Sequence, residues 1–131
     1  MIFIDSNVPM YLVGAHHSNK TRAIQLVGEL IRNGERLVTD IEVYQEILHR
    51  YTAIRRADAI DGAFRSLDAI ADEVFGYGMP EIRAARTIID SVEGVSARDA
   101  LHVAVMRSNR VDRILSFDRG FDAIAGIERL Q

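Results

Sequence analysis

The 131-residue sequence contains no cysteine, which excludes disulfide bonds and metal sites built from thiolates. No apolar stretch approaches the roughly 18 consecutive residues that a membrane-spanning helix requires. The first apolar residues are not preceded by a basic stretch, so we expect no signal peptide. These absences predict a protein of the cytoplasm that makes no contact with a membrane.

Positive charge is also scarce, because the formal net charge is −3 and Lys20 is the only lysine. Proteins that coat duplex nucleic acid usually carry a large basic excess, so binding of that kind is not expected. The sequence lacks the glycine-rich loops of nucleotide-dependent enzymes and the GxSxG elbow of serine hydrolases. Its four histidines do not follow the HExxH spacing, and we expect His102 to be a hydrogen-bonded structural residue.

Only two prolines and no Gly/Ser-rich linker interrupt the sequence, and its length argues for one domain spanning residues 1–131. Short apolar runs alternate with stretches of helical periodicity, which predicts a largely parallel sheet. Strands are expected at 2–4, 36–38, 74–75, 113–116 and 127–130. Helices are expected around 9–12 and at 21–32, 39–51, 57–73, 80–93 and 96–108.

The third of these helices has a recognisable start. Thr39 followed by Glu42 three residues later matches a capping box, in which each side chain binds the backbone N–H of the other. We therefore expect Thr39 to be the N-cap and Glu42 to belong to the cap. The apolar residues that this helix is expected to bury are Ile41, Tyr44, Ile47, Leu48 and Tyr51.

Four carboxylates lie in or next to the predicted elements, three of them at element boundaries. Asp5 follows the first predicted strand and Asp118 follows the strand near residue 115, while Asp99 opens a helix and Glu46 lies within one. Acids at the carboxyl ends of parallel strands meet at the crevice where α/β sheets bind ligands. We therefore expect these side chains to converge.

Taken singly, each acid also has a structural explanation. Asp5 fits a helix N-cap as well as it fits a site, and Asp99 follows Ser96 in a helix-start pattern. Glu46 alone would be read as solvent-exposed, and Asp122 as a helix or turn cap. The four acids taken together favour a site, because like charges that lie close together raise each other's pKa values and cost stability unless a cation binds.

An oxygen-only cluster without cysteine suits a hard cation such as Mg²⁺ or Mn²⁺. Such a cation lowers the pKa of a bound water and stabilises charge on a phosphate, so the cluster indicates metal-assisted phosphoester chemistry. The sequence therefore predicts a metal-dependent enzyme acting on a phosphate ester.

Four segments resemble the motifs of PIN-domain proteins, the family that includes VapC-like toxins. The opening Phe3-Ile4-Asp5-Ser6-Asn7 resembles the strand that ends in the first acid of the family. The segment around Glu46 resembles the second acid motif, and 99–104 resembles the helix of the third. Residues 116–121, with Ser116 and Asp118, are similar to the fourth, and the resemblance covers nearly the whole chain.

The resemblance implies a three-layer α/β/α fold with a central parallel sheet of four to five strands, and a Mg²⁺- or Mn²⁺-dependent ribonuclease. It implies that Asp5 and Asp99 bind the metal, with Glu46 and Asp118 contributing directly or through water. Asn7 and Ser116 would orient the site. It also implies a homodimer and a cognate antitoxin. RNA would be held by a few arginines, for which Arg50, Arg55, Arg98 and Arg119 are candidates.

Two other functions stay open. A metal-dependent phosphohydrolase acting on small phosphate esters usually needs a second Asp two residues after the first, and position 7 is Asn. A protein-binding module of the same fold without catalysis is the other alternative, and the complete set of four acids argues against it.

Overall fold

Five short strands form the central sheet of the computed structural model, which describes residues 1–131. Their order across the sheet is β3-β2-β1-β4-β5, and every neighbouring pair is parallel. The strands are β1 (Ile2–Ile4), β2 (Leu37–Asp40), β3 (Glu73–Phe75), β4 (Arg113–Leu115) and β5 (Glu128–Leu130). The predicted parallel sheet of four to five strands is thus confirmed, with β1 at its centre.

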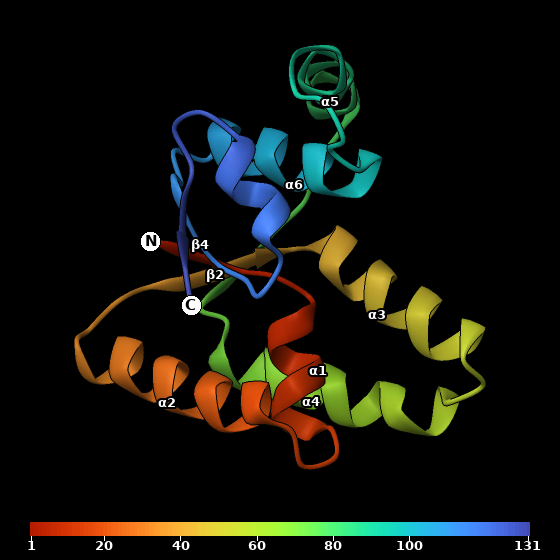
Figure 1. The fold of residues 1–131 in the computed structure, drawn as a ribbon, viewed down its shortest axis with the longest axis vertical. Coiled ribbons are helices and arrows are strands. Elements are labelled where there is room, and N and C mark those ends of the chain that lie inside the picture. Colours follow the sequence, from red (N-terminus) through yellow and green to blue (C-terminus); the bar gives the residue numbers. More distant parts are fainter.

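Helices cover both faces of this sheet, which confirms the predicted α/β/α layering (Figure 1). The helices are α1 (Asn7–Val13), α2 (Ser18–Arg32), α3 (Ile41–Ala53), α4 (Ile60–Ile70), α5 (Met79–Ser91) and α6 (Ala97–Ser108). Figure 1 shows α5 and α6 on one side of the sheet, α1, α2 and α4 on the other, and α3 leading away from the end of β2. None of these helices is long and apolar enough to cross a lipid bilayer.

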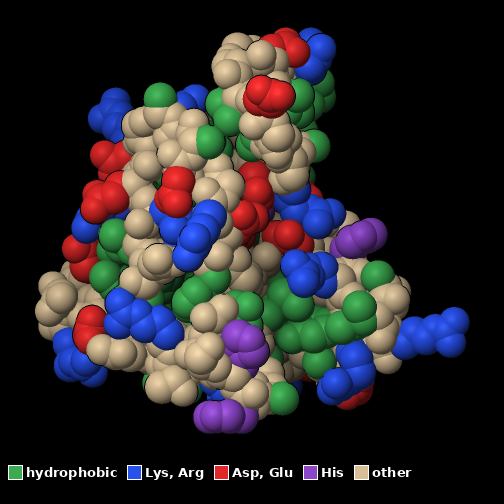
Figure 2. All heavy atoms as spheres, in the orientation of Figure 1, with side chains coloured by type: hydrophobic (Ala, Val, Ile, Leu, Met, Phe, Trp, Pro, Cys, Tyr) green, Lys and Arg blue, Asp and Glu red, His purple; other side chains and the backbone are tan.

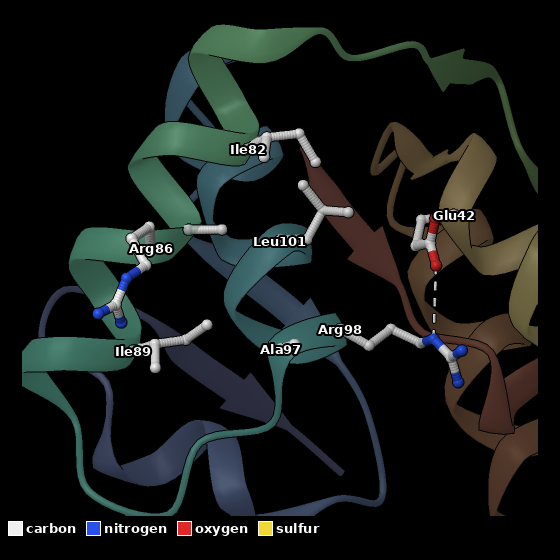
Figure 3. A pocket seen from close by; sticks show the side chains of 8 residues that line it. Glu42, Ile82, Arg86, Ile89, Ala97, Arg98 and Leu101 are labelled. Atoms are coloured by element: carbon white, nitrogen blue, oxygen red, sulfur yellow. Dashed lines mark ion pairs between the residues drawn. The ribbon is translucent and has the colours of Figure 1, made fainter.

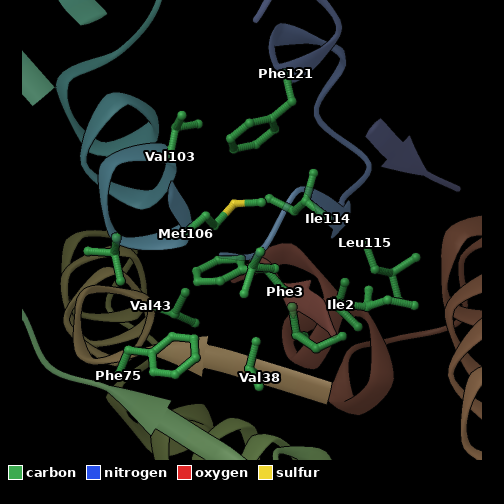
Figure 4. Close-up of a cluster of buried hydrophobic side chains, with 14 of the residues drawn as sticks. Ile2, Phe3, Val38, Val43, Phe75, Val103, Met106, Ile114, Leu115 and Phe121 are labelled. Carbon is green, nitrogen blue, oxygen red and sulfur yellow. The ribbon is translucent and has the colours of Figure 1, made fainter. Parts of the chain in front are cut away.

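The hydrophobic core lies between the central strands and the helices. Phe3 in β1 and Ile114 in β4 are fully buried, and they pair in adjacent positions of the sheet. In Figure 4 the side chain of Met106 from α6 points toward this pair, while Val103 from α6 lies close to Phe121 from the short 3₁₀ helix Arg119–Ala123. Residues 100–106 of α6 are all buried, and α5 packs against this helix.

The start of α3 differs from the prediction. Thr39 is not the N-cap but the third residue of β2, and its hydroxyl donates a hydrogen bond of 2.9 Å to the carbonyl of Ile4. Asp40 is the N-cap, since its Oδ1 accepts from the backbone N–H of Val43 at 2.9 Å. The capping box is therefore wrong. β-branched Thr suits a buried strand, and Asp is among the strongest N-caps, so the boundary lies one residue later.

The buried face of α3 shifts with this boundary. Val43, Ile47 and Tyr51 form the buried stripe at a spacing of four residues. Ile41 and Leu48 were expected to be buried and are 48% and 43% exposed, because they lie on either side of that stripe.

Other boundaries move by a few residues. Helix α2 begins at Ser18, three residues earlier than predicted, because the His17 imidazole accepts a hydrogen bond from the Asn19 N–H and acts as an N-cap. The segment predicted as one helix over 57–73 is a 3₁₀ turn at Ala57–Ala59 followed by α4, and β3 begins at Glu73. As predicted, α6 starts after Ser96, whose hydroxyl accepts from the Asp99 N–H.

The burial of α3 gives a stability prediction from two adjacent residues. Ile47→Ala empties a fully buried position and should lower the free energy of unfolding by about 2–5 kcal/mol. Leu48→Ala, on the exposed flank, should change it by about 0.5 kcal/mol or less. Urea unfolding of both variants without metal measures the difference, and equal losses would contradict the assigned register of α3.

Candidate active site at the carboxyl edge of the sheet

The carboxyl ends of three neighbouring strands meet at one edge of the sheet. Asp5 follows β1, Asp40 ends β2 and Ser116 follows β4. From β1 the chain continues to β2 on one side and returns later to β4 on the other, so a crevice opens between β1 and β4. This is the position at which open α/β sheets bind their ligands, and the predicted acids lie around it.

Asp5 is buried and held in one orientation by three donors. Its Oδ1 accepts from the Ser6 N–H at 2.8 Å, and its Oδ2 accepts from the Ser116 hydroxyl at 2.6 Å and the Asn7 amide at 3.2 Å. Burial raises the pKa of Asp5 against these donors. A carboxylate accepts up to about four hydrogen bonds, so one lone pair of Asp5 stays open to a ligand.

Ser116 and Asn7 form the support of this carboxylate. The Asn7 amide also donates to Ser116 Oγ at 3.2 Å, and the same oxygen accepts from the Asp118 N–H at 3.0 Å. Asn7 Oδ1 in turn accepts from the Phe117 N–H at 3.3 Å. Residues from the start of α1 and from the loop after β4 are thereby fixed to Asp5 by side-chain hydrogen bonds.

Asp99 and Asp118 approach each other over Gly120. Asp118 starts the 3₁₀ segment and accepts from the Gly120 N–H at 2.8 Å. A Cβ at position 120 would lie 3.1 Å from Asp118 Oδ1 and 4.0 Å from Asp99 Oδ2. Glycine at this position therefore allows both carboxylates to face the same space. Asp99 lies in the first turn of α6.

The carboxyl of Asp99 carries the clearest electrostatic signature of the site. Burial, followed by the charges of Asp5 and Asp118, raises the pKa of Asp99 to about 7. Glu46 adds to the increase and His102 opposes it. Asp99 is thus an acid that ionises fully at neutral pH only when additional positive charge is close by.

His102 is a buried source of positive charge beside the carboxylates. The ring is fully buried; Nδ1 lies 2.8 Å from Asp40 Oδ2 and Nε2 lies 3.6 Å from Glu46 Oε1. Burial lowers the pKa of His102, but its contacts with Asp40 and Glu46 outweigh this and raise it to about 10. A pKa in this range favours the imidazolium at neutral pH, in which both ring nitrogens carry protons.

Glu46 lies at the inner end of α3 and is largely buried, contrary to its reading as a single exposed acid. Burial raises the pKa of Glu46, but the neighbouring His102 and Ser6 side chains and the charges of His102 and Arg98 outweigh it and lower the pKa overall. Arg98 Nη1 lies 3.5 Å from Glu46 Oε2, and Arg98 Nε lies 3.4 Å from Glu42 Oε1. The ionised form of Glu46 is therefore favoured.

Arg98 separates two hollows. On one side, a mostly apolar hollow of about 560 Å³ lies between α5 and α6, and Figure 3 shows Glu42 bound to Arg98 at its border. On the other side, a cavity of about 370 Å³ is lined by Glu46, Asp99, Asp118, Gly120 and the Ser96 segment. Figure 2 shows acidic side chains gathered in a hollow between α6 and the start of α3, with basic side chains beside them.

The donor atoms of this cavity fit a hard divalent cation. Single ligand atoms of Asp5, Glu46 and His102 lie within 4.8 Å of one another, and Glu46 Oε1 is buried without a hydrogen-bond donor. With His102 protonated, the available ligands are carboxylate oxygens of Asp5, Glu46, Asp99 and Asp118. Oxygen ligands of this kind suit Mg²⁺ or Mn²⁺ rather than zinc.

The structure therefore brings together six of the predicted residues. Hydrogen bonds connect Asp5, Asn7 and Ser116, and a single cavity is lined by Glu46, Asp99 and Asp118. Arg98 lies at this cavity, whereas Arg50 lines a neighbouring groove and Arg119 is exposed beside Asp118. Asp122 pairs with Arg129 at 2.8 and 3.0 Å and takes no part in the cluster.

Sequence reasoning missed Asp40. It is fully buried, ends β2 and binds both the N-terminus of α3 and His102. A signal was present, because Asp40 follows the apolar pair Leu37-Val38 after one intervening residue, which is similar to the pattern of Asp5. The assignment of Thr39 as the cap concealed it. His102 is hydrogen-bonded as expected, but its charge and its position between Asp40 and Glu46 have no local signature.

Comparison with protein-family models matches residues 2–127 to the PIN domain. Among curated proteins, Ribonuclease VapC13 of Mycobacterium tuberculosis is 50% identical over 130 residues, with 99% of each chain covered. Ribonuclease VapC23 of the same species is 35% identical over 118 residues, covering 90% of this chain and 93% of that protein. The similarity to VapC13 covers nearly the whole chain and therefore the site described above.

Solved structures share the fold at low sequence identity. VapC20 of Mycobacterium tuberculosis, described as a toxin that cleaves the sarcin–ricin loop, superimposes with a TM-score of 0.73 at 19% identity and 98% coverage of both chains. VapBC2 of Rickettsia felis, bound to a promoter DNA fragment, gives a TM-score of 0.74 at 12% identity, covering 99% of this chain and 98% of that one. These likenesses establish the fold alone.

The raised pKa of Asp99 predicts how stability depends on pH. The unfolded chain loses the Asp99 proton near pH 4 and the folded chain near pH 7, so metal-free stability should fall as pH rises between these values. Asp99→Asn should reduce this fall and unfold at higher urea than the wild type at pH 8. We expect a difference on the order of 1–2 kcal/mol, because solvent screens a partly exposed carboxyl.

Millimolar Mg²⁺ supplies the control for this prediction. It should restore the stability of the wild type at pH 8 and have little effect on Asp99→Asn. Parallel pH profiles for the two metal-free proteins would contradict the proposed charge repulsion at Asp99.

Asp40→Asn tests the buried ion pair without removing the helix cap, since Asn is also a good N-cap. The amide places a donor where His102 needs an acceptor, so the pKa of His102 should fall from about 10. We expect a loss of about 1.5–3 kcal/mol in unfolding free energy at pH 7. Proton NMR of the His102 ring follows the pKa. Asp58→Asn, in an exposed pair with Arg56, should cost less than about 1 kcal/mol.

Proposed function

The chain belongs to the PIN-domain family, and from this premise we propose that it is a metal-dependent endoribonuclease, the toxin of a toxin–antitoxin pair. The observation that supports the proposal most directly is the convergence of Asp5, Glu46, Asp99 and Asp118 at the switch point of the sheet. The similarity to two proteins named ribonuclease, which spans nearly the whole chain, supports RNA as the substrate.

We propose that Asp5 and Asp99 bind Mg²⁺ or Mn²⁺, with Glu46 and Asp118 as direct or water-mediated ligands. The bound cation would lower the pKa of a water molecule and stabilise charge on the phosphate during in-line attack. The preference for these ions rests on an all-oxygen ligand set in a chain without cysteine.

The other residues of the site act by position and charge. Ser116 and Asn7 hold the Asp5 carboxylate in place, so that its open lone pair is aimed before any ligand arrives. His102 keeps Glu46 ionised through its positive charge, while Arg98 lies at the mouth of the cavity. We infer that Arg98 contacts the phosphate of the substrate, since a guanidinium binds phosphate with two parallel hydrogen bonds.

A cognate antitoxin follows from the toxin proposal. Solved structures of the same fold include VapBC-1 of Haemophilus influenzae, FitAcB of Neisseria gonorrhoeae and FitAB bound to a DNA fragment. We propose that this chain likewise pairs with an antitoxin and acts in the cytoplasm, where its RNA substrate is found. A homodimer, which the sequence resemblance implies, stays a prediction.

Cleavage of RNA tests the proposed function. Wild-type protein should cleave structured RNA in Mg²⁺ or Mn²⁺, and EDTA should stop the reaction. Asp5→Asn and Asp99→Asn should each lower kcat/KM at least about 100-fold, and Ser116→Ala about 10- to 100-fold through the orientation of Asp5. Asp122→Asn is the matched control, since this nearby acid is bound to Arg129 and should leave cleavage unchanged.

Calorimetry separates metal binding from catalysis. Wild-type protein should bind Mn²⁺, and the double variant Asp5→Ala/Asp99→Ala should not. Cleavage that persists in EDTA would contradict the proposal. If the wild type bound no metal even with RNA present, a protein-binding module without catalysis would be favoured instead.

A further inference from the structure

A second concave surface adjoins the carboxylate cluster and has no role in the function proposed so far. This groove of about 520 Å³ lies between α1, the α1–α2 connection, α3 and the loop after β4. We call it the aromatic groove and define it by Tyr11, His17, Phe117 and Arg50, together with Asn7 and Asp118 at its inner end.

Three rings in the groove are arranged as a platform. The rings of Tyr11 and His17 are stacked, with centroids 5.3 Å apart and planes inclined by 29°. Phe117 meets Tyr11 edge to face at 5.2 Å and 74°. His17 is exposed, and Tyr11 and Phe117 each keep part of their surface open to solvent. A planar group could therefore extend this stack without any rearrangement of the core.

The groove is continuous with the carboxylate cluster. Asp118 lines both the groove and the acidic cavity. The hydrogen bonds from Phe117 N–H to Asn7 Oδ1 and from the Asn7 amide to Asp5 Oδ2 fix the platform to the central carboxylate. A ligand group in the groove would therefore lie beside whatever occupies the cluster.

Charge in the groove favours an anionic ligand. Arg50 is exposed at the rim and makes no ion pair with a carboxylate, and the exposed His16 and His17 line the same groove. Asp118 is the one acid among the lining residues, and it belongs to the cluster. Aromatic faces combined with a free arginine are the usual elements of single-stranded nucleic acid sites.

From this geometry we propose that the aromatic groove binds an unpaired nucleobase next to the scissile phosphate, stacked on the Tyr11–His17 platform, with Arg50 on a neighbouring phosphate. The inference rests on the proposed ribonuclease function. Both faces of a base within a duplex are covered by its neighbours, so the platform selects a base that is unstacked in a loop or bulge. The groove would then restrict cleavage to unpaired positions of structured RNA.

Fluorescence of 2-aminopurine tests the stacking directly. The probe is a single-stranded RNA of about 12 nucleotides with 2-aminopurine at each position in turn, bound to protein that carries Asp99→Asn to prevent cleavage. At one or two positions the fluorescence should be quenched on binding, and Tyr11→Ala should remove the quenching. The affinity for the same RNA should fall about 5- to 100-fold in Tyr11→Ala.

Conservative variants separate the role of the rings from that of the fold. Tyr11→Phe should bind RNA like the parent protein, because it keeps the ring and loses only the hydroxyl. His17→Asn keeps a helix N-cap at α2 but removes the ring, and should weaken binding. Arg50→Gln should lower the slope of log affinity against log salt concentration by about 1, which corresponds to the loss of one phosphate contact. His49→Ala, an exposed histidine of α3 outside the groove, should have no effect.

The outcomes distinguish this inference from the proposed function. If Tyr11→Ala binds RNA as tightly as its parent and no position is quenched, the inference is overturned. A protein segment is then the expected occupant of the groove. Cleavage by the wild type would still support the ribonuclease. If the wild type cleaves no RNA but Tyr11-dependent quenching is observed, the ribonuclease proposal fails and the base-binding groove stands.

Discussion

Mutual repulsion of carboxylates is the constraint on which the site depends. The carboxyl edge of the sheet holds Asp5 and Asp40 with little or no exposure to water, and Glu46, Asp99 and Asp118 face the same region. The fold opposes this repulsion with one buried cation, the His102 imidazolium, between Asp40 and Glu46. Its neutralisation is incomplete, since the pKa of Asp99 is still raised to about 7. The remaining negative charge is what a divalent cation would satisfy.

Helix α6 carries both a repelling carboxylate and the buried cation that offsets the repulsion. Asp99 and His102 are three residues apart and therefore lie on neighbouring positions of one helix face. Ser96 caps the helix, and its apolar residues pack into the core, so α6 has little freedom to move. A rigid helix thus carries both a proposed ligand and the charge that keeps Glu46 ionised. The supporting network of Asp5, Asn7 and Ser116 provides equal rigidity on the side of β1 and β4.

Much of this arrangement was predictable because its signals are local. Asp5 and Asp118 follow apolar runs, and Ser96 precedes Asp99 at cap spacing, so these three acids could be placed from the sequence. Asp40 and the buried state of Glu46 could not be placed in this way. Thr39 and Asp40 are both acceptable caps, and only the long-range hydrogen bond from Thr39 to Ile4 assigns Thr39 to the strand. The pairing of Asp40 with His102 joins residues 62 positions apart.

A protein with a net charge of −3 has to bind a polyanion at its most acidic point, so different parts of the site have to supply the affinity and remove the repulsion. Affinity for RNA cannot come from the general field of the protein, which repels phosphate. It has to come from close contacts that act within a Debye length, such as an arginine beside the cavity, and from stacking, which salt and charge affect little. Cation binding removes the local repulsion, so metal and RNA should each increase the affinity for the other. The acidic cluster therefore couples RNA binding to the ion that the proposed reaction requires.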